Sequence, residues 1–289
     1  MSKKKTKIKL ELTRRDFLIV GGTAAGSAVA AQVLTTGPLS PFASFKQEQV
    51  EGGEEASTSV SGRHWGMVIN LDKCIGCEYC LRACSATNDV WVDQTGENQE
   101  QTNGRPEKPW NIVVEEQTSS GTPFFFSRPC LHCGDAPCVE VCPVQATYHR
   151  EDGLVIMNYD RCIGCRYCEI ACPYDARKFN WQARTEVNPF IPTWGIAEVE
   201  RRPRGVVEKC TFCIHRIDAG LKQGFTPGED REATPACVNI CPVGARVFGD
   251  LNNPDSQVSQ AIATNPTIRL REELGTEPSV YYITPKEGL

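Results

Sequence analysis

The sequence predicts an α+β fold built from a duplicated module, in which two short strands lead into a cysteine-rich loop and a short helix. Three observations support this prediction: sixteen cysteines in four groups, an internal repeat that contains them, and hairpin signals beside them. A length of 289 residues suits one or two domains with hydrophobic cores of their own. With 40% hydrophobic and 23% charged residues, the composition is globular and excludes collagen-like, disordered and polytopic membrane proteins.

The first thirty residues have the order of an export signal. Five lysines precede Thr13–Leu18, which reads TRRDFL, and a weakly apolar stretch from Phe17 to about Leu34 follows. This order is typical of a twin-arginine signal, and Ala28–Ala30 fits a cleavage site. We expect a signal peptide at 1–30 and a flexible linker at 31–62, so that the mature protein is periplasmic, at the outer face of the cytoplasmic membrane. A retained membrane anchor stays open as an alternative.

The mature chain is acidic. Removal of residues 1–30 takes away seven basic and two acidic side chains and leaves 24 basic and 34 acidic ones, a formal charge of −10. A protein that binds nucleic acid needs a basic face. The charge balance therefore argues against a nucleic-acid partner.

The cysteines fall into four sets of four, and none is left over. Set one is Cys74, Cys77, Cys80 and Cys84; set two is Cys130, Cys133, Cys138 and Cys142; set three is Cys162, Cys165, Cys168 and Cys172; set four is Cys210, Cys213, Cys237 and Cys241. Sets one and three have the C-x2-C-x2-C-x3-C spacing of bacterial ferredoxins. Sets two and four widen the middle interval and keep the C-x3-C ending.

This spacing has a chemical reason in 4Fe-4S clusters. Three cysteines at two-residue intervals surround one cluster, and a fourth, three residues further on, points from a helix toward a neighbouring cluster. Four sets therefore predict four 4Fe-4S clusters that exchange ligands in pairs. Gly76 and Gly164 stand between the first two cysteines of their sets, where a positive φ brings backbone N–H groups near the sulfurs. A proline ends the helix after the last cysteine of three sets, whereas Ser85 stands there in set one and leaves that helix exit undecided.

Three other uses of cysteine fit the pattern less well. An exported chain with an even number of cysteines could form eight disulfides, but cysteines two residues apart are poorly placed to bridge one another. Structural zinc takes two C-x2-4-C halves, frequently with histidine, and does not need a third cysteine at this spacing. A catalytic thiol would be single and flanked by a base. We therefore predict no catalytic residue.

Several basic side chains lie beside the cysteines. His132 and His215 are unnecessary as ligands when the cysteine sets are complete, so we expect each to donate an N–H group near a cluster or to pack at the surface. Lys73, Arg161 and Lys209 each precede the first cysteine of a set. A positive charge there would stabilise the reduced cluster, and the alternative is a solvated side chain.

The chain contains an internal repeat. Asn70–Cys80 recurs as Asn158–Cys168, and Cys138–Ala146 matches Cys237–Ala245. The chain is therefore a duplicated module. Two segments outside the repeat, 85–108 and 214–236, are polar and interrupted by glycine and proline, which predicts surface loops that could contact partners.

Two hairpins are predicted near the cysteine sets. Strand patterns at 146–149 and 154–158 flank a Glu-Asp-Gly turn signal, and patterns at 111–115 and 124–126 flank a Thr-Ser-Ser-Gly turn signal. The three phenylalanines at 124–126 are expected to pack in a core or an interface. Each module then reads as strand, turn, strand, cluster loop and short helix.

Together with Phe248–Leu251 and Arg269–Tyr282, which follow set four, the cysteine sets resemble those of the four-cluster iron-sulfur subunits of the DMSO reductase family. That family includes the electron-transfer subunits of polysulfide, tetrathionate and formate-dependent nitrite reductases. The resemblance covers about residues 64–284. It implies two ferredoxin-like domains with two 4Fe-4S clusters each, one at 63–125 and 195–289 for sets one and four, and an inserted one at 126–194 for sets two and three.

The resemblance also implies the ligands of each cluster, because sets one and four exchange cysteines in this family, as do sets two and three. The four implied ligand groups are Cys74, Cys77, Cys80 and Cys241; Cys210, Cys213, Cys237 and Cys84; Cys130, Cys133, Cys138 and Cys172; and Cys162, Cys165, Cys168 and Cys142. Some relatives replace a cysteine of set three and hold a 3Fe-4S cluster there. This chain keeps Cys165, so four 4Fe-4S clusters are implied.

Finally, the resemblance implies a function. It indicates a non-catalytic electron-transfer subunit of an oxidoreductase complex in anaerobic respiration. Such a subunit relays single electrons between a quinone-interacting integral membrane subunit and a molybdopterin-type catalytic subunit. Two alternatives stay open: a free periplasmic carrier that delivers electrons to multihaem cytochromes, and a disulfide-stapled structural or adhesion protein.

Overall fold

A four-stranded mixed sheet brings together strands from distant parts of the sequence. The computed structural model describes residues 62–92 and 109–286, so the predicted signal peptide and all but the last residue of the predicted linker lie outside the described residues. The strand order is β8–β1–β10–β9, with β1 at Trp65–Asn70, β8 at Arg246–Asp250, β9 at Thr267–Arg269 and β10 at Val280–Ile283. β1 pairs with β10 in parallel and with β8 antiparallel.

β1 is central because its side chains are apolar on both faces. Trp65, Met67 and Ile69 belong to the main hydrophobic core. Val68 points to the opposite face and packs against Val258 of α7 (Gln257–Thr264). A strand covered on both sides reads as an almost continuous apolar run, which is the pattern of this segment.

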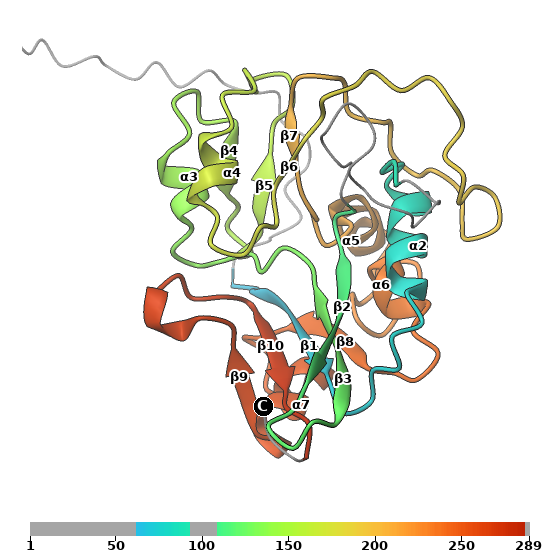
Figure 1. The fold of residues 1–289 in the computed structure, drawn as a ribbon, viewed down its shortest axis with the longest axis vertical. Coiled ribbons are helices and arrows are strands. Elements are labelled where there is room, and N and C mark those ends of the chain that lie inside the picture. Colours follow the sequence, from blue (N-terminus) through green and yellow to red (C-terminus); the bar gives the residue numbers. More distant parts are fainter. Residues whose placement is uncertain (1–61, 93–108, 287–289) are drawn as a thin grey trace, which may run out of the picture. The chain divides into compact units, whose positions relative to one another are not determined.

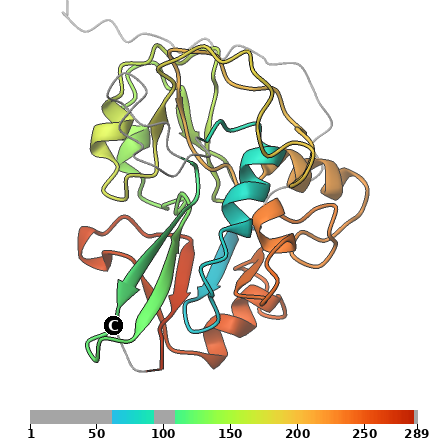
Figure 2. The ribbon, with the colours of Figure 1, turned by 45° about the vertical axis from the view of Figure 1, so that its right-hand side comes forward.

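Both predicted hairpins are confirmed. β2 (Ile112–Gln117) pairs with β3 (Pro123–Arg128), and β4 (Thr147–His149) pairs with β5 (Val155–Met157), both antiparallel. Phe126 of β3 stacks on Tyr282 of β10, with ring centroids 4.7 Å apart, and the β2–β3 hairpin lies beside that strand in Figures 1 and 2. The phenylalanines of β3 therefore serve packing, as predicted.

Three of the helices are short because a Cys-Pro pair follows each of them. α3 spans Pro137–Glu140, α4 spans Tyr167–Ala171 and α6 spans Ala236–Asn239. α2 (Tyr79–Thr87) differs, since it continues for three residues beyond Cys84. Ser85 keeps the backbone N–H that proline lacks, and this resolves the helix exit that the sequence left undecided.

The described parts of the two polar insertions include helical residues, so the prediction of surface loops was wrong in part; residues 93–108 lie outside the described residues. Residues 85–87 belong to α2 and are buried, and residues 214–222 form α5 (Ile214–Lys222). Ile217 of α5 is fully buried in the main core. Its neighbours Ile214 and Leu221 pack against the same core, so one apolar face of a short helix lies within a polar segment.

All described residues belong to one compact unit. Within it, the β4–β5 hairpin, α3 and α4 form one group, and the four-stranded sheet, α7 and the β2–β3 hairpin form another (Figures 1 and 2). A small ladder of β6 (Lys178–Phe179) and β7 (Val207–Glu208) and a 3-10 turn, η1 (Glu272–Leu274), complete the elements of the described ranges. In these ranges no helix has both the length and the apolar character needed to cross a bilayer.

Candidate iron-sulfur cluster sites

The fold brings the cysteine sets together in the pairs that the resemblance implies. All sixteen cysteines are free thiols. α2, which carries the end of set one, packs against α6, which carries part of set four, and α3 packs against α4 in the same way for sets two and three. We call the four ligand groups that the resemblance implies sites I to IV.

Site I is a cavity lined by Cys74, Cys77, Cys80 and Cys241. Gly76 in its loop has a φ of 69°, and Gly164 in the equivalent loop has a φ of 68°, so the predicted left-handed glycines are confirmed. Gly76 also has no room for a side chain, because a Cβ there would lie 2.4 Å from the Phe125 ring. The backbone N–H of Ala245 donates to the Cys241 Sγ at 3.3 Å.

Site II contains Cys84 with Cys210, Cys213 and Cys237. Burial raises the pKa of the Cys84 thiol well above its usual range, and the charges of the other three cysteines raise it further. Asn88, one turn after Cys84, directs its side-chain amide at the Cys213 Sγ, 3.5 Å away. The backbone N–H of Phe212 donates to the Cys210 Sγ at 3.4 Å.

Site III contains Cys130, Cys133, Cys138 and Cys172. Burial raises the pKa of the Cys133 thiol to about 12, and the charges of the other three cysteines of the site add to this effect. Cys130 and Cys133 are buried and Cys138 and Cys172 are partly buried, so four thiolates confined here would repel one another. Iron binding would therefore release protons here, since iron takes the deprotonated sulfur.

Site IV contains Cys165, the one exposed cysteine among the sixteen. Cys168, in contrast, is buried and lies close enough to Cys162 for their charges to interact. Cys142 follows α3, which packs on the helix that carries Cys168. Burial opposes ionisation of Cys142, but backbone N–H groups, including that of Ala146 at 3.2 Å, lower the pKa of this thiol overall.

The sites form a series. The charges of Cys80 and Cys237 interact between sites I and II, and those of Cys210 and Cys130 interact between sites II and III. Cys138 and Cys168 are related in the same way between sites III and IV. These interactions favour the order I, II, III, IV, which agrees with the packing of α2 on α6 and of α3 on α4 and with the hydrogen bond from His132 to the Cys210 carbonyl oxygen.

Two arginines at these sites were not predicted from the sequence. Arg246 is 5% exposed and donates to the Cys237 Sγ at 3.4 Å, and Arg177 is 1% exposed and donates to the Cys138 Sγ at 3.0 Å. Both follow the same motif, C-P-x-x-A-R, after the last cysteine of their sets. The repetition of arginine at this position of the motif could have identified both residues from the sequence.

The basic residues named from the sequence divide into buried and exposed ones. Lys209 is fully buried and donates from Nζ to the carbonyl oxygen of Cys210 at 2.8 Å, whereas Lys73 and Arg161 are exposed. His132 is fully buried, and its Nδ1 accepts from the N–H of Val155 at 3.2 Å. Burial and the charge of Lys209 hold the pKa of His132 well below its usual range.

The neutral ring of His132 therefore donates from Nε2 to the carbonyl oxygen of Cys210, 3.1 Å away. It links the loop of set two to that of set four and is a structural residue, as expected. His215 instead hydrogen bonds to Glu198 at 2.9 Å. Burial disfavours the Glu198 carboxylate, but His215 and Arg216 lower its pKa to about 2.

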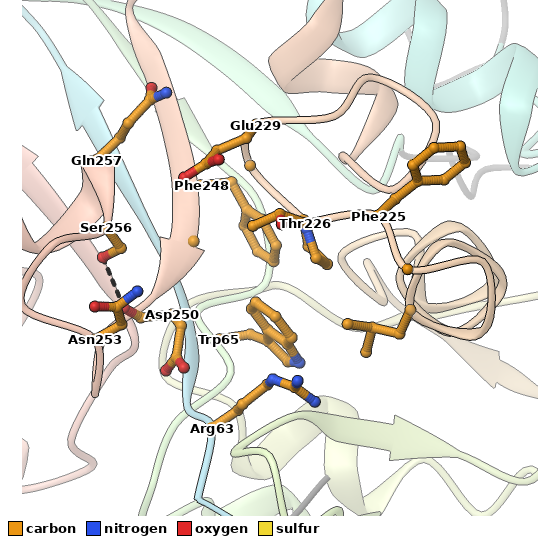
Figure 3. A pocket seen from close by; sticks show the side chains of 15 residues that line it. Arg63, Trp65, Phe225, Thr226, Glu229, Phe248, Asp250, Asn253, Ser256 and Gln257 are labelled. Atoms are coloured by element: carbon orange, nitrogen blue, oxygen red, sulfur yellow. Dashed lines mark hydrogen bonds between the residues drawn. The ribbon is translucent and has the colours of Figure 1, made fainter. Parts of the chain in front are cut away.

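A separate pocket of about 330 Å³ lies beside α7 (Figure 3). Trp65, Phe248, Asp250 and Thr226 are among its lining residues. Trp65 and Phe248 stack with ring centroids 5.8 Å apart. None of the lining residues is a cysteine, so this pocket is not one of the cluster sites.

No three Cys, His, Asp or Glu side chains within the described ranges converge as the ligands of a single metal ion would. The ligands of a cubane each bind a different iron, so a cluster site does not require such convergence. The cysteines, the backbone N–H donors and the buried arginines suit a group that carries negative charge on its sulfurs. These residues therefore fit 4Fe-4S clusters.

Gly164 and Gly244, which both have a positive φ, allow a matched test of the loops. Alanine at Gly244, which has a φ of 58° and open space around it, should cost about 1 to 2 kcal/mol of stability from backbone strain alone. Alanine at Gly164 adds a clash, because its Cβ would lie 2.1 Å from the carbonyl oxygen of Gly205. We expect a further loss of about 1 to 3 kcal/mol in denaturant unfolding. Equal losses in the two variants would contradict this packing.

The chain matches known families of iron-sulfur domains. A 4Fe-4S dicluster domain matches residues 73–146 and 161–245, and a second domain of the same description matches residues 122–188. The protein is thus a ferredoxin-type iron-sulfur protein. These matches and the sixteen cysteines are consistent with four 4Fe-4S clusters.

The chain is similar to the subunits of several reductases over most of its length. It is 42% identical over 243 residues to the iron-sulfur cluster-binding subunit of menaquinone reductase from Nitratidesulfovibrio vulgaris, which covers 77% of this chain and 89% of that subunit. It is 34% identical to a tetrathionate reductase subunit from Salmonella typhimurium, covering 96% of this chain and 90% of the other. It is also 34% identical to a polysulfide reductase chain from Wolinella succinogenes, covering 78% and 97%.

The chain belongs to this family of iron-sulfur subunits, which carry 4Fe-4S dicluster domains and include relatives named as subunits of dimethyl sulfoxide, polysulfide and tetrathionate reductases. Members of the family are non-catalytic electron-transfer subunits, and this chain is one of them.

Proposed function

We propose that this protein relays single electrons through four 4Fe-4S clusters, held at sites I to IV, between a quinone-linked membrane subunit and a molybdopterin-type catalytic subunit. The observation that carries the proposal is the chain of contacts between the sites. Arg246 lines the cavity of site I and donates to the Cys237 Sγ of site II, and His132 in the loop of set two hydrogen bonds to the Cys210 carbonyl oxygen of site II. The helices α3 and α4, which carry Cys138 and Cys168, pack together. Bound clusters supply the one-electron redox chemistry. We assign the ligands as the four groups implied by the resemblance, with one cysteine exchanged between the paired sets.

The residues of the chain hold the clusters and set their surroundings. The cysteines provide thiolate ligands, and backbone N–H groups such as those of Ala245, Ala146 and Phe212 donate to the sulfurs. Hydrogen bonds to sulfur and burial both change the reduction potential of a cluster. All four cysteines of site II and two of site III are buried, so these sites would be the better shielded from water. The cysteines of site I are all partly exposed and site IV contains the exposed Cys165, so these two sites would be open to partners.

Exposed apolar side chains at the two ends of the series support docking there. Ile75 and Tyr79 surround site I and are 56% and 38% exposed. Ile163, Tyr167 and Ile170 surround site IV and are 64%, 58% and 82% exposed. Exposed apolar patches beside a functional group mark interaction surfaces. We assign one electron-transfer partner to each end.

The proposal includes the domain organisation and the location of the protein. Residues 63–125 and 195–289 would form the first ferredoxin-like domain, and residues 126–194 the second. The twin-arginine signal predicted at 1–30 supports a periplasmic location, at the outer face of the cytoplasmic membrane. Association with the membrane would then be through the partner subunits.

The test is an anaerobic pull-down from native membranes with a tag at the C-terminus, in which iron, molybdenum and haem are measured on one sample. We expect about sixteen irons per chain together with molybdenum in a large partner. The same iron content with haem and no molybdenum would favour the free periplasmic carrier. A colourless, iron-free and well-folded chain would overturn the relay and support the disulfide-stapled protein.

A further inference from the structure

Each of the two pairs of cysteine sets contains one deeply buried arginine, at the same position after the last cysteine of a set. Arg246 follows Cys241 by five residues, and Arg177 follows Cys172 by five residues. In set two, Thr147 occupies this position, and its Oγ1 accepts a hydrogen bond from Arg177 Nη1 at 2.9 Å. The repeat thus places one arginine in each pair of cluster sites.

Arg246 lies between sites I and II. It lines the cavity of site I and donates to the Cys237 Sγ of site II at 3.4 Å. Its other partners are the Oδ1 of Asn111 at 2.9 Å, the hydroxyl of Ser127 and the thioether sulfur of Met67 at 3.6 Å. All three of these partners are neutral.

Arg177 lies between sites III and IV in the same manner. It donates to the Cys138 Sγ of site III at 3.0 Å, and its charge also acts on Cys168 of site IV. Its remaining partners are Thr147 and the thioether sulfur of Met157, 3.0 Å away. The sequence has three methionines. Apart from Met1, these are Met67, which contacts Arg246, and Met157, which contacts Arg177.

The absence of a carboxylate partner separates these arginines from other arginines of the described chain. Arg202, which is similarly buried, pairs with Glu208 at 2.6 Å, and Arg201 pairs with Asp89 at 2.8 Å. Within the described residues, neither Arg177 nor Arg246 contacts an Asp or Glu. A buried cation needs an anionic partner to be stable, and the sulfurs of the sites are the negative groups within reach.

We propose that Arg246 is a counter-charge shared by the clusters at sites I and II, that Arg177 is its equivalent for sites III and IV, and that each raises the reduction potentials of both clusters in its half. The inference rests on the ligand groups of the proposed function. Reduction adds one negative charge to a cluster, and a buried positive charge without a carboxylate stabilises that state. The neutral partners orient the guanidinium group and do not neutralise its positive charge.

The sharpest test changes Asn111 rather than the arginine. Asn111→Asp keeps the shape of the side chain and places a carboxylate against Arg246. The Nδ2 of Asn111 has no hydrogen-bond partner among the described residues, so the substitution breaks no bond. We expect a redox titration followed by EPR to show that two of the four midpoint potentials fall. The equilibrium constant for reduction of each of these clusters should fall at least tenfold, which corresponds to about 59 mV for one electron.

The arginines themselves give the complementary result. Arg246→Gln should lower the same two midpoints as Asn111→Asp, and Arg177→Gln should lower the other two. Arg161→Gln is the matched control, because it removes an exposed charge beside site IV and should leave all midpoints within about 59 mV, as water and salt screen it. Unchanged midpoints in the Asn111 and arginine variants, or shifts of all four in a single variant, would overturn the proposal.

Iron content separates this inference from the proposed function. Fewer than about sixteen irons in the unmodified protein would count against the four-cluster relay itself. If Arg246→Gln loses the iron of one pair of sites, the variant Arg246→Lys distinguishes a role of the charge from a role in packing, because lysine keeps the positive charge. Retained iron and midpoints in that variant support the counter-charge, and equal loss of iron would show that the arginine serves packing instead.

Discussion

Replacement of Cys84 by alanine is expected to empty site II and to leave site I loaded. The iron content should fall from about sixteen to about twelve atoms per chain. Cys84 belongs to set one by sequence, but its charge interacts with those of Cys210, Cys213 and Cys237. The remaining signals, followed by EPR after anaerobic reconstitution, should match those of a Cys213→Ala variant.

A Cys77→Ala variant is the control for this experiment. Cys77 lines the cavity of site I with Cys74, Cys80 and Cys241. Its loss should remove a different EPR signal from the one that Cys84→Ala removes. Identical spectra for the Cys84 and Cys77 variants would show that set one serves a single cluster and that no ligand is exchanged.

The second large effect is expected at Arg202, where alanine should destabilise the fold by about 3 to 5 kcal/mol. Arg202 and Glu208 are 8% and 6% exposed, and their side chains are 2.6 Å apart. Arg202 also donates to the carbonyl oxygens of Asn88 and Asp89, the two residues that follow α2. Its removal would leave a buried carboxylate without a partner, as well as unpaired carbonyl groups.

Chemical denaturation of the reconstituted protein measures this effect. Arg271→Ala is the comparison, since that side chain is half exposed and forms a long ion pair with Glu273 at 3.7 Å. An exposed pair of this kind contributes no more than about 1 kcal/mol. A similar loss in the two variants would mean that the Arg202–Glu208 pair is not a source of stability.

The cysteine loops and hairpins could be predicted from the sequence because their signals are local. The spacing of set three, the glycine at 164 and the turn before β5 all lie within a few residues of the structure that they determine. α5 was missed because only Ile214, Ile217 and Leu221 mark its apolar face within a polar segment. A short helix of this kind is recognisable only when the core that it faces is known.

Long-range contacts were beyond the reach of local patterns. The exchange of ligands between sets one and four was implied by a family resemblance, because spacing does not say which helix meets which loop. Arg177 and Arg246 carry a repeated motif, but a buried arginine that contacts sulfur rather than a carboxylate departs from the usual rule of charge pairing. Only the folded arrangement shows why both arginines are buried.

The pairing of β1 with β10 has a consequence for the order in which the molecule is assembled. Met67 pairs with Val280, so β1 leaves the ribosome 213 residues before its parallel neighbour. Sites I and II likewise wait for Cys237 and Cys241, whereas all cysteines of sites III and IV lie between 130 and 172. Iron can therefore enter the middle of the nascent chain first, and the sheet that joins the two ends closes last.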